Sequence, residues 1–536
     1  MVYFPSELVY AITGHCDTTT KLQCTLVNKH WCSNIQWSTK ELGKQLVTAI
    51  KQGRLATVNW ILALPRMTGK IKYKRLIAIA SKYGHAQLVA TLMTDPSANP
   101  AAYKNSALNL AAENGHLDVI RLLFRDDRVY PTRYIMEEAC ERGHLETVRL
   151  LISHKRADLK IDHETDALYE ACKHGHLEVV RLLLNDPRLI PLDTVKPLNA
   201  ACRNGHLAVV RLLLDEGRIP PQTRYYTDEY CTTPLITACD YGHIDVVRLL
   251  LKDPRAIPLE DDTRPLEAAC RKGHLEIVRL LLEDGRIAPQ SDQYENYYRK
   301  TPLEAACYSG HIDVVRLILS DGRVDPSEDD NAPLRAACGE GHIDIVRLLL
   351  SDQRVQPTGA IHTPLSEACA GGHFEIVQLL LDDARVDPKL LGLFDSPLLK
   401  AACTSGDIDV VRLLLSDLRI DPTEKRNAAV AAACGGGKIE IVRLLLEDER
   451  IQTIGSKALE AACRGGHLQV VHLLLGDPRV YPTANDNSAM RVACQWACFN
   501  VIRLLLIDGR ADPNVEYTKE DWDDLDYAQV DRILGR

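Results

Sequence analysis

The stretch APLRAACGEGHIDIVRLLLSD, residues 332–352, decides the fold because it encodes two short helices joined by a tight turn. Pro333 suits the first turn of a helix, where no backbone N–H is needed, and Gly341 tolerates the left-handed conformation that ends one. In the second helix, Asp344 lies in the first turn, where a negative charge suits the helix dipole, three residues before Arg347. The stretch therefore predicts a helical hairpin, with Ile, Val and Leu gathered on the buried side of its second helix.

The same hairpin recurs along the chain and is easiest to follow by its Gly-His pair. Most copies are 29 to 32 residues apart, and most second helices are followed by an Asp-x-Arg segment and a proline, which cannot continue a helix. One hairpin cannot bury its apolar faces alone, so stacked copies must supply the core. The eleven Gly-His pairs begin at residues 84, 115, 143, 175, 205, 242, 273, 310, 341, 372 and 466. Four more slots hold Gly53-Arg54, Gly406-Asp407, Gly437-Lys438 and Ala497-Cys498, which makes fifteen units.

The elements Thr-Pro-Leu, Ala-Ala/Cys, Gly-His and Val-Val-Arg-Leu-Leu-Leu resemble the ankyrin repeat. The resemblance implies an all-α fold, an ankyrin-repeat solenoid of about fifteen helix-turn-helix units over residues 41–516. A small helical N-terminal module is expected at residues 1–40, and the apolar and acidic residues of 517–536 predict a C-terminal capping helix. Where the family usually has His after Pro-Leu, this chain has other residues, so the hydrogen bonds of that His are not expected. The slot holds Asn199, Glu267, Arg335 and Ser366, for example.

Cysteine usage indicates a helical core rather than disulfides. Twelve cysteines share one position of the repeat, which Ser81 and Ala112 occupy in earlier units, and free Cys behaves as a small hydrophobe. Equivalent positions in stacked repeats are about 8–10 Å apart, beyond the roughly 7 Å between Cα atoms that a disulfide allows. We expect buried thiols in a reducing compartment. The twelve are Cys140, Cys172, Cys202, Cys239, Cys270, Cys307, Cys338, Cys369, Cys403, Cys434, Cys463 and Cys494.

Charge and hydropathy exclude several classes of protein. The net charge of −9 disfavours a nucleic-acid-binding surface. No run reaches the 18 or so apolar residues of a membrane span, and Pro5 and Glu7 stand where a signal peptide needs basic and apolar residues. We expect a cytoplasmic and/or nuclear protein without a membrane partner.

No motif predicts catalysis, a cofactor or a metal site. Residues 435–438 read GGGK but lack the first spaced glycine and the Ser or Thr of a phosphate-binding loop. Cys494 and Cys498 have no further ligands in the sequence to complete a zinc site. The Gly-His histidines recur at turns and are interpreted as structural. The chain is therefore predicted to be no enzyme and to act by binding proteins.

The first forty residues carry a different pattern: FPSELVYAI at 4–12, Asp17, and LQCTLVNKHW at 22–31. This resembles the F-box, although Thr13, Cys16 and Lys21 replace residues that are usually apolar or aromatic. In that family a three-helix module binds the Skp adaptor of cullin-type ubiquitin ligases, and the rest of the chain recruits a substrate. The resemblance implies that seven positions contact the adaptor or form the module's core. They are Pro5, Leu8, Ile12, Leu22, Leu26, Val27 and Trp31.

Two interpretations of this N-terminal segment lead to two functions. As an F-box, it makes the chain a substrate-recruiting subunit of an SCF-type (Skp-cullin-F-box) ubiquitin ligase, with the ankyrin groove binding an unknown target protein. As a plain helical cap, it shields the open end of the repeats. The chain is then an ankyrin scaffold or sequestering protein without a ubiquitin role.

Two junctions between repeats are longer than the others and rich in tyrosine. The segments 221–230 and 289–298 both begin Pro-Gln and carry three tyrosines each. Insertions in repeat proteins map to loops that often bind partners, and Tyr is enriched at binding hot spots. We interpret these loops as partner-binding, with solvated loops as the alternative. The tyrosines are Tyr225, Tyr226, Tyr230, Tyr294, Tyr297 and Tyr298.

The two residues before each Gly-His are expected to line the groove of an ankyrin stack. In the central units they are basic with interleaved tyrosines, whereas later pairs, such as those at 370–371 and 435–436, are small. An acidic peptide or acidic protein surface would suit this groove; a merely solvated face is the alternative. The candidate partner-binding residues here are Arg142, Lys173, Arg203, Tyr241, Arg271, Lys272 and Tyr308.

Overall fold

The computed structural model describes most of the repeat region. The described residues are 39–64, 72–155, 167–186, 188, 195–221, 233–257, 262–290, 300–358, 363–388, 398–512, 529–530 and 532–534. The seven F-box-like positions, the six tyrosines of the long junctions and most of the expected capping helix lie outside these ranges. The chain divides into two compact units, residues 1–257 and 258–536, each of which is described by itself.

The N-terminal unit contains seven helical hairpins in its described residues. Each hairpin has a first helix, which ends at the Gly-His slot, and a second helix, which begins just after it. The pairs are α3 (Thr39–Lys51) with α4 (Leu55–Leu62), α5 (Tyr73–Lys82) with α6 (Ala86–Met93), α7 (Ala102–Glu113) with α8 (Leu117–Leu123), α9 (Arg133–Glu141) with α10 (Leu145–Ser153), α11 (Ala167–Lys173) with α12 (Leu177–Leu184), α13 (Lys196–Arg203) with α14 (Leu207–Glu216), and α15 (Pro234–Asp240) with α16 (Ile244–Leu251). A short 3₁₀ turn, η4 (Pro254–Ala256), follows α16.

The C-terminal unit contains eight hairpins of the same kind in its described residues. The pairs are α17 (Arg264–Lys272) with α18 (Leu275–Asp284), α19 (Pro302–Ser309) with α20 (Ile312–Leu319), α21 (Glu328–Gly339) with α22 (Ile343–Leu350), α23 (Pro364–Gly371) with α24 (Phe374–Asp382), α26 (Leu398–Ser405) with α27 (Ile408–Ser416), α28 (Glu424–Gly435) with α29 (Ile439–Glu447), α30 (Ser456–Arg464) with α31 (Leu468–Leu475), and α32 (Ala484–Gln495) with α33 (Phe499–Asp508). Seven and eight hairpins confirm the fifteen units predicted from the Gly-His slots, and every regular element in the described ranges is helical.

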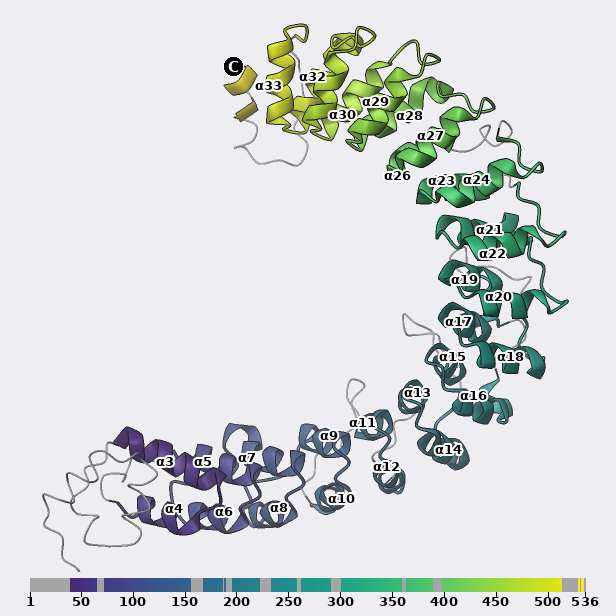
Figure 1. Cartoon of the computed structure of the whole chain (residues 1–536). Helices are drawn as coiled ribbons and strands as arrows, with labels where there is room; N and C mark the ends of the chain where they lie inside the picture. Colours follow the sequence, from purple (N-terminus) through teal and green to yellow (C-terminus); the bar gives the residue numbers. More distant parts are fainter. Residues whose placement is uncertain are drawn as a thin grey trace, which may run out of the picture. The chain divides into compact units, whose positions relative to one another are not determined.

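Within each unit the helices form two layers. First helices of neighbouring repeats contact each other, as α9 and α11 do, and second helices likewise, as α10 and α12 do. Each first helix also contacts the second helix of its own repeat. Figure 1 shows these layers as two rows of helices within each unit. The core is the space between the rows.

The core is built from the same positions in every repeat. In α11 and α12, for example, Leu168, Cys172, Val180 and Leu183 have no exposed surface. Burial of a Val or Leu side chain stabilises a fold by about 1.5–3 kcal/mol, so the repeated pattern supplies the driving force for stacking. All twelve cysteines at the repeated position are buried and free, which confirms that they are core thiols.

Gly-His pairs also connect neighbouring repeats through hydrogen bonds. Gly310 has a φ of 80°, and a Cβ atom at this position would lie 2.6 Å from Cε1 of His342 in the next repeat. Only glycine satisfies both conditions. His342 Nε2 donates to the carbonyl oxygen of Tyr308 at 3.1 Å. Bonds of this kind, 2.8 to 3.2 Å long, are made by His85, His116, His144, His176, His206, His243, His311, His342, His373 and His467. This His–carbonyl ladder confirms the structural interpretation of the Gly-His histidines.

A second ladder uses the Asp-x-Arg segment, which the sequence indicated only as the end of a helix. Arg450 Nη2 donates to Asp448 Oδ2 at 2.7 Å and to the carbonyl oxygen of Leu415 at 2.8 Å. Leu415 belongs to the last turn of α27, where carbonyl groups lack a partner within the helix. Equivalent bonds to the preceding second helix are made by Arg218, Arg255, Arg323, Arg385, Arg419, Arg479 and Arg510. This Arg–carbonyl ladder holds the second-helix layer together.

Four first helices begin with a left-handed turn that the sequence did not predict. In α21, Asp329, Asp330 and Asn331 have φ values of 49°, 57° and 60°, and the right-handed helix starts only after them. Each non-glycine residue in this conformation costs roughly 1–2 kcal/mol. Arg335 Nη2 donates to the carbonyl oxygen of Asp329 at 2.9 Å and offsets part of this cost. The other three turns lie at 103–105, 425–427 and 485–487.

Candidate partner-binding surface

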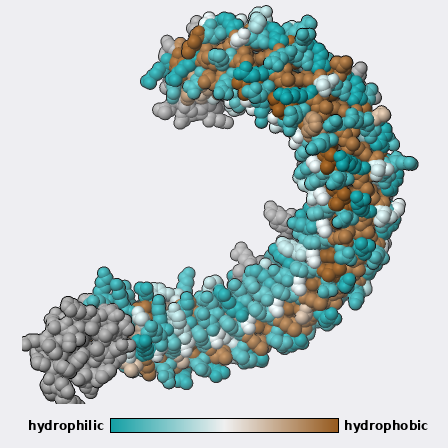
Figure 2. All heavy atoms as spheres, in the orientation of Figure 1, coloured by the Kyte–Doolittle hydropathy of each residue, from teal (hydrophilic) through white to brown (hydrophobic). Residues whose placement is uncertain are grey.

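The predicted groove residues lie at the C-terminal ends of the first helices. We call the two residues before each Gly-His slot the ridge: 141–142, 173–174, 203–204 and 240–241 in the N-terminal unit, and 271–272, 308–309 and the later equivalents in the C-terminal unit. The ridge is exposed at its second position in most central repeats, at Arg142 and Tyr241 for example. In Figure 2, the edge of the N-terminal unit formed by its first helices is mostly hydrophilic. Polar contacts, rather than a broad apolar patch, therefore dominate this face.

Arg142 is already engaged by carboxylates. Its Nη2 atom lies 3.6 Å from Glu113 of the preceding repeat and 3.6 Å from Glu138 of its own helix. Burial, followed by the nearby charges of Glu141 and Glu113, raises the pKa of the Glu138 carboxyl above its ordinary value. Two carboxylates, those of Glu113 and Glu138, therefore already compensate the charge of the Arg142 guanidinium.

Lys173 is also paired. Its Nζ atom donates to Glu170 Oε2 at 3.0 Å, and this hydrogen bond raises the pKa of the Lys173 ammonium. The same ammonium lies 5.8 Å from the centre of the Tyr169 ring. His174 Nε2 lies 3.6 Å from the same carboxylate atom. The Glu170 carboxylate therefore compensates the charge of Lys173 in the α11 part of the ridge.

Arg203 differs from these two cations. Its guanidinium carbon lies 5.4 Å from the centre of the Tyr241 ring on α15, a cation–π distance. Its carbonyl oxygen accepts the hydrogen bond of His243 in the His–carbonyl ladder, at 2.9 Å. Tyr241 keeps 49% of its surface exposed. The structure thus brings together two predicted residues from neighbouring repeats and orients them on the ridge.

In the C-terminal unit, the ring of Tyr308 is contacted by a lysine of its own repeat. Lys300 Nζ lies 2.9 Å from the centre of the Tyr308 ring, and burial lowers the pKa of this ammonium. Glu304 lies midway between them in sequence on α19, and burial raises the pKa of its carboxyl. Arg271 and Lys272 are exposed at the end of α17. The sequence singled out Tyr308 but missed Glu304, four residues earlier on α19, and Lys300, which lies just before the Thr301 N-cap of that helix.

Several exposed aromatic side chains were not predicted. Tyr134, at the start of α9, is 60% exposed, Tyr481 is 69% exposed, and Trp496 on the last repeat's ridge is 53% exposed. These exposed side chains could have been predicted from the sequence, because they are large aromatic residues at positions that are not buried in the repeat. The later ridge is otherwise small, as predicted, with Gly371 and Gly435 among its residues.

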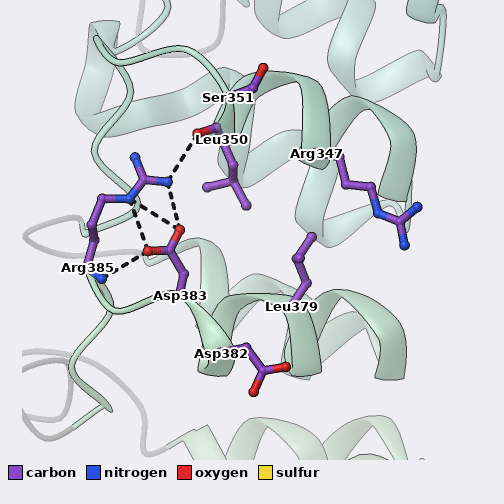
Figure 3. A pocket seen from close by; sticks show the side chains of 7 residues that line it. All are labelled: Arg347, Leu350, Ser351, Leu379, Asp382, Asp383 and Arg385. Atoms are coloured by element: carbon purple, nitrogen blue, oxygen red, sulfur yellow. Dashed lines mark hydrogen bonds and ion pairs between the residues drawn. The ribbon is translucent and has the colours of Figure 1, made fainter.

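A shallow cavity lies away from the ridge, between the second helices α22 and α24. It has a volume of about 340 Å³ and is lined by Arg347, Leu350, Ser351, Leu379, Asp382, Asp383 and Arg385. Figure 3 shows Arg385 held between the Asp383 carboxylate and the Leu350 carbonyl, at 2.7 Å and 3.1 Å. Two of the charged groups of the cavity thus belong to the Arg–carbonyl ladder.

Metal and membrane features were searched in the described ranges. No group of three or more His, Cys, Asp or Glu side chains there could hold a metal ion. None of the helices in those ranges combines the length and apolar character needed to cross a bilayer.

The hairpins stack through hydrogen bonds that recur from repeat to repeat, while the exposed residues of the ridge differ between repeats. This combination defines a helical-repeat binding scaffold. A family model described as ankyrin repeats (3 copies) matches residues 46–134, 132–191, 185–261, 253–330, 322–391, 398–486 and 432–517, and the chain belongs to the ankyrin-repeat family. Proteins of this kind are typically non-enzymatic and use their repeats for protein–protein interaction, which is the role of this chain.

Solved structures resemble parts of the chain. The crystal structure of the human ASB11 ankyrin repeat domain is 25% identical, with a TM-score of 0.34, over 42% of this chain and 99% of that one. No curated protein matches the chain.

Proposed function

We propose that this chain recruits a target protein to an SCF-type ubiquitin ligase and has no catalytic activity of its own. In this proposal the F-box-like segment binds a Skp-type adaptor, and the ridge binds the target. The observation that carries the ligase part is the ungapped resemblance of residues 4–31 to the F-box. The exposed ridge supports the target-binding part, because its side chains project from helices whose main chains are fixed by the His–carbonyl ladder.

Co-purification with a Skp adaptor tests the ligase part. We expect the full chain to bind the adaptor and the double variant Pro5→Ala/Leu8→Ala to lose it. A matched control removes two exposed apolar side chains of the repeats, Leu418 and Ile507, which are 89% and 81% exposed. The variant Leu418→Ala/Ile507→Ala should bind the adaptor normally. No adaptor binding by the wild type would leave an ankyrin scaffold or sequestering protein without a ubiquitin role.

The tyrosine-rich junctions belong to the same proposal as partner-binding loops. Their composition supports it, because Tyr combines a rigid contact area with a hydroxyl group. Deleting residues 222–230 and 291–298 together tests them. We expect weaker target capture with unchanged adaptor binding, and unchanged capture would contradict a role for these loops.

A further inference from the structure

We propose that Arg203 and Tyr241 form the anchor of the target-binding ridge, and that they hold a Glu or Asp side chain of an extended peptide segment of the target. This inference rests on the proposed function, because it uses the same ridge. It goes further by naming one pair of residues and one ligand chemistry. The prediction from sequence had spread the basic character over the whole central groove.

Arg203 is the ridge cation that is prepared to bind an anion. Its main chain is fixed by the 2.9 Å hydrogen bond from His243, and its guanidinium lies over the Tyr241 ring at 5.4 Å. A cation–π contact of this kind uses none of the guanidinium N–H groups as hydrogen-bond donors to another side chain, so they remain available for a ligand. No carboxylate among the described residues forms an ion pair with Arg203, so those donors face solvent.

The neighbouring cations show why the anchor is confined to this pair. Arg142 shares two carboxylates at 3.6 Å, and Lys173 donates to Glu170 at 3.0 Å. A ligand carboxylate would have to displace these internal partners and would be repelled by them. At Arg203 it meets a guanidinium that forms no ion pair with the described residues. The electrostatic potential therefore favours an anion at α13 and α15 rather than along α9 or α11.

A single carboxylate fits this anchor better than a phosphate does. The guanidinium fork binds a planar carboxylate through two parallel N–H···O bonds. A phosphate carries nearly two negative charges and is recognised by clusters of Arg residues. Glu170 and the paired Lys173 on the preceding first helix supply no such cluster. A nucleic acid would need a row of cations that are free to contact its phosphates, whereas Arg142 and Lys173 in the neighbouring repeats are paired with carboxylates.

Tyr241 adds an apolar contact beside the charge. One face of its ring meets the Arg203 guanidinium, and 49% of its surface remains exposed. Tyr and Arg are both enriched at binding hot spots. An acidic residue of the target with an apolar residue nearby would therefore contact both members of the pair.

A selection from a random 12-residue peptide library on the immobilised full-length chain tests the inference. We expect the selected peptides to be enriched in Glu or Asp, and the enrichment to vanish on Arg203→Ala. Fluorescence anisotropy with one selected peptide then gives the affinity. Arg203→Ala should weaken binding at least tenfold, and Arg203→Lys should also weaken it because the fork is lost. Tyr241→Ala should weaken binding several-fold.

Two controls separate the anchor from general charge effects. Arg211 is an exposed arginine in the same repeat, on the second helix α14, and Arg211→Ala removes the same charge without affecting the ridge. It should bind the peptide normally. A twin peptide with Gln in place of every acidic residue should not bind. Selection of peptides without acidic residues, or equal losses in Arg203→Ala and Arg211→Ala, would overturn the inference.

Two further probes test the choice of ligand. A twin peptide with phosphoserine in place of each Glu, or an oligothymidylate of 12 nucleotides, should bind more weakly than the Glu peptide. Tighter binding of either probe would overturn the carboxylate assignment. Failure of the anchor is distinct from failure of the proposed function. If the chain binds the adaptor but selects no acidic peptide, the anchor is wrong and the ligase proposal stands. If it selects acidic peptides through Arg203 but does not bind the adaptor, the anchor stands and the ligase proposal is wrong.

Discussion

The imidazole of His342 donates a hydrogen bond from Nε2 to the main-chain carbonyl of Tyr308, which belongs to the preceding repeat. The bond is 3.1 Å long, and it joins the turn of one hairpin to the end of the first helix of its neighbour. Because the acceptor is a backbone atom, the same bond can recur whatever side chain the ridge carries. Loss of this hydrogen bond should therefore weaken the stacking of the two repeats and leave the helices within each repeat intact.

His342→Ala should lower the free energy of unfolding by about 1 kcal/mol, the net value of a typical intramolecular hydrogen bond. Thermal unfolding of the full chain, together with hydrogen exchange of α19 and α21, measures the effect. The control is His472→Ala, an exposed histidine on the second helix α31. It should leave both measurements unchanged, and equal effects of the two variants would contradict the ladder.

The last repeat should be stabilised by restoring its missing Gly-His pair. Ala497 occupies the glycine position with a φ of 50°, and Cys498 Sγ lies 3.9 Å from the carbonyl oxygen of Arg464. Ala497→Gly/Cys498→His removes the strain and supplies the donor, each worth about 1 kcal/mol. We expect a higher unfolding midpoint and slower hydrogen exchange in α32 and α33. Ala401→Gly, within the right-handed helix α26, should instead lower the midpoint.

Acid should weaken the Arg–carbonyl ladder. The hydrogen bond from Arg479, 2.6 Å between Nη2 and Oδ2, holds the pKa of Asp477 below its ordinary value. A carboxyl whose pKa is lowered by folding stabilises the fold above its unfolded pKa, about 3.9, and this contribution is lost as the pH falls through the folded pKa. Asp477→Asn should therefore be less stable than the wild type at pH 7, with a difference that shrinks below about pH 4.

Unfolding midpoints measured between pH 7 and pH 2.5 check this dependence. The control is Glu440→Gln, because Glu440 pairs with Arg443 at 3.9 Å with both side chains more than half exposed. An exposed pair contributes little, so this variant should follow the wild type at every pH. A difference between wild type and Asp477→Asn that persists unchanged at pH 2.5 would contradict the prediction.

The core thiols should react only when the repeats open. Burial raises the pKa of the Cys434 thiol to about 12, so almost no thiolate is present at neutral pH. Cys498 is only partly buried. Iodoacetamide labelling followed by peptide mass spectrometry should modify Cys498 in the native chain and Cys434 only in denaturant. Equal native rates for the two would place Cys434 outside the core.

The sequence predicted the number and type of the hairpins because the apolar residues of each repeat recur at the same positions. Leu168 and Cys172 are examples of such buried positions. It could not predict the left-handed turn at 329–331, because Asp and Asn are also common in ordinary turns and helix caps. The Asp-x-Arg segment was visible, but its acceptor lies in the preceding repeat. Only the stacked structure places the Leu415 carbonyl within reach of Arg450.

In the candidate site, too, the sequence predicts which residues lie on the ridge but does not predict their contacts with neighbouring helices. Arg142, Lys173 and Arg203 all lie in the two residues before a Gly-His pair, and the sequence gives no sign that their surroundings differ. Their environments differ because of partners on other turns or helices, such as Glu113 beside Arg142. The sequence therefore predicted the surface on which a partner could bind. Which of its cations are already paired with carboxylates of the chain is seen only in the structure.

The His–carbonyl ladder has a consequence for how such a chain can change in length. Most junctions offer the same donor and the same kind of backbone acceptor, so a hairpin that carries the Gly-His pair can be inserted at another such junction without new complementary side chains. A duplicated repeat would be joined to both neighbours from the start. Gene duplication and loss could thus lengthen or shorten the protein by whole hairpins, while substitutions on the ridge, at Arg203 in our proposal, would alter what it recognises.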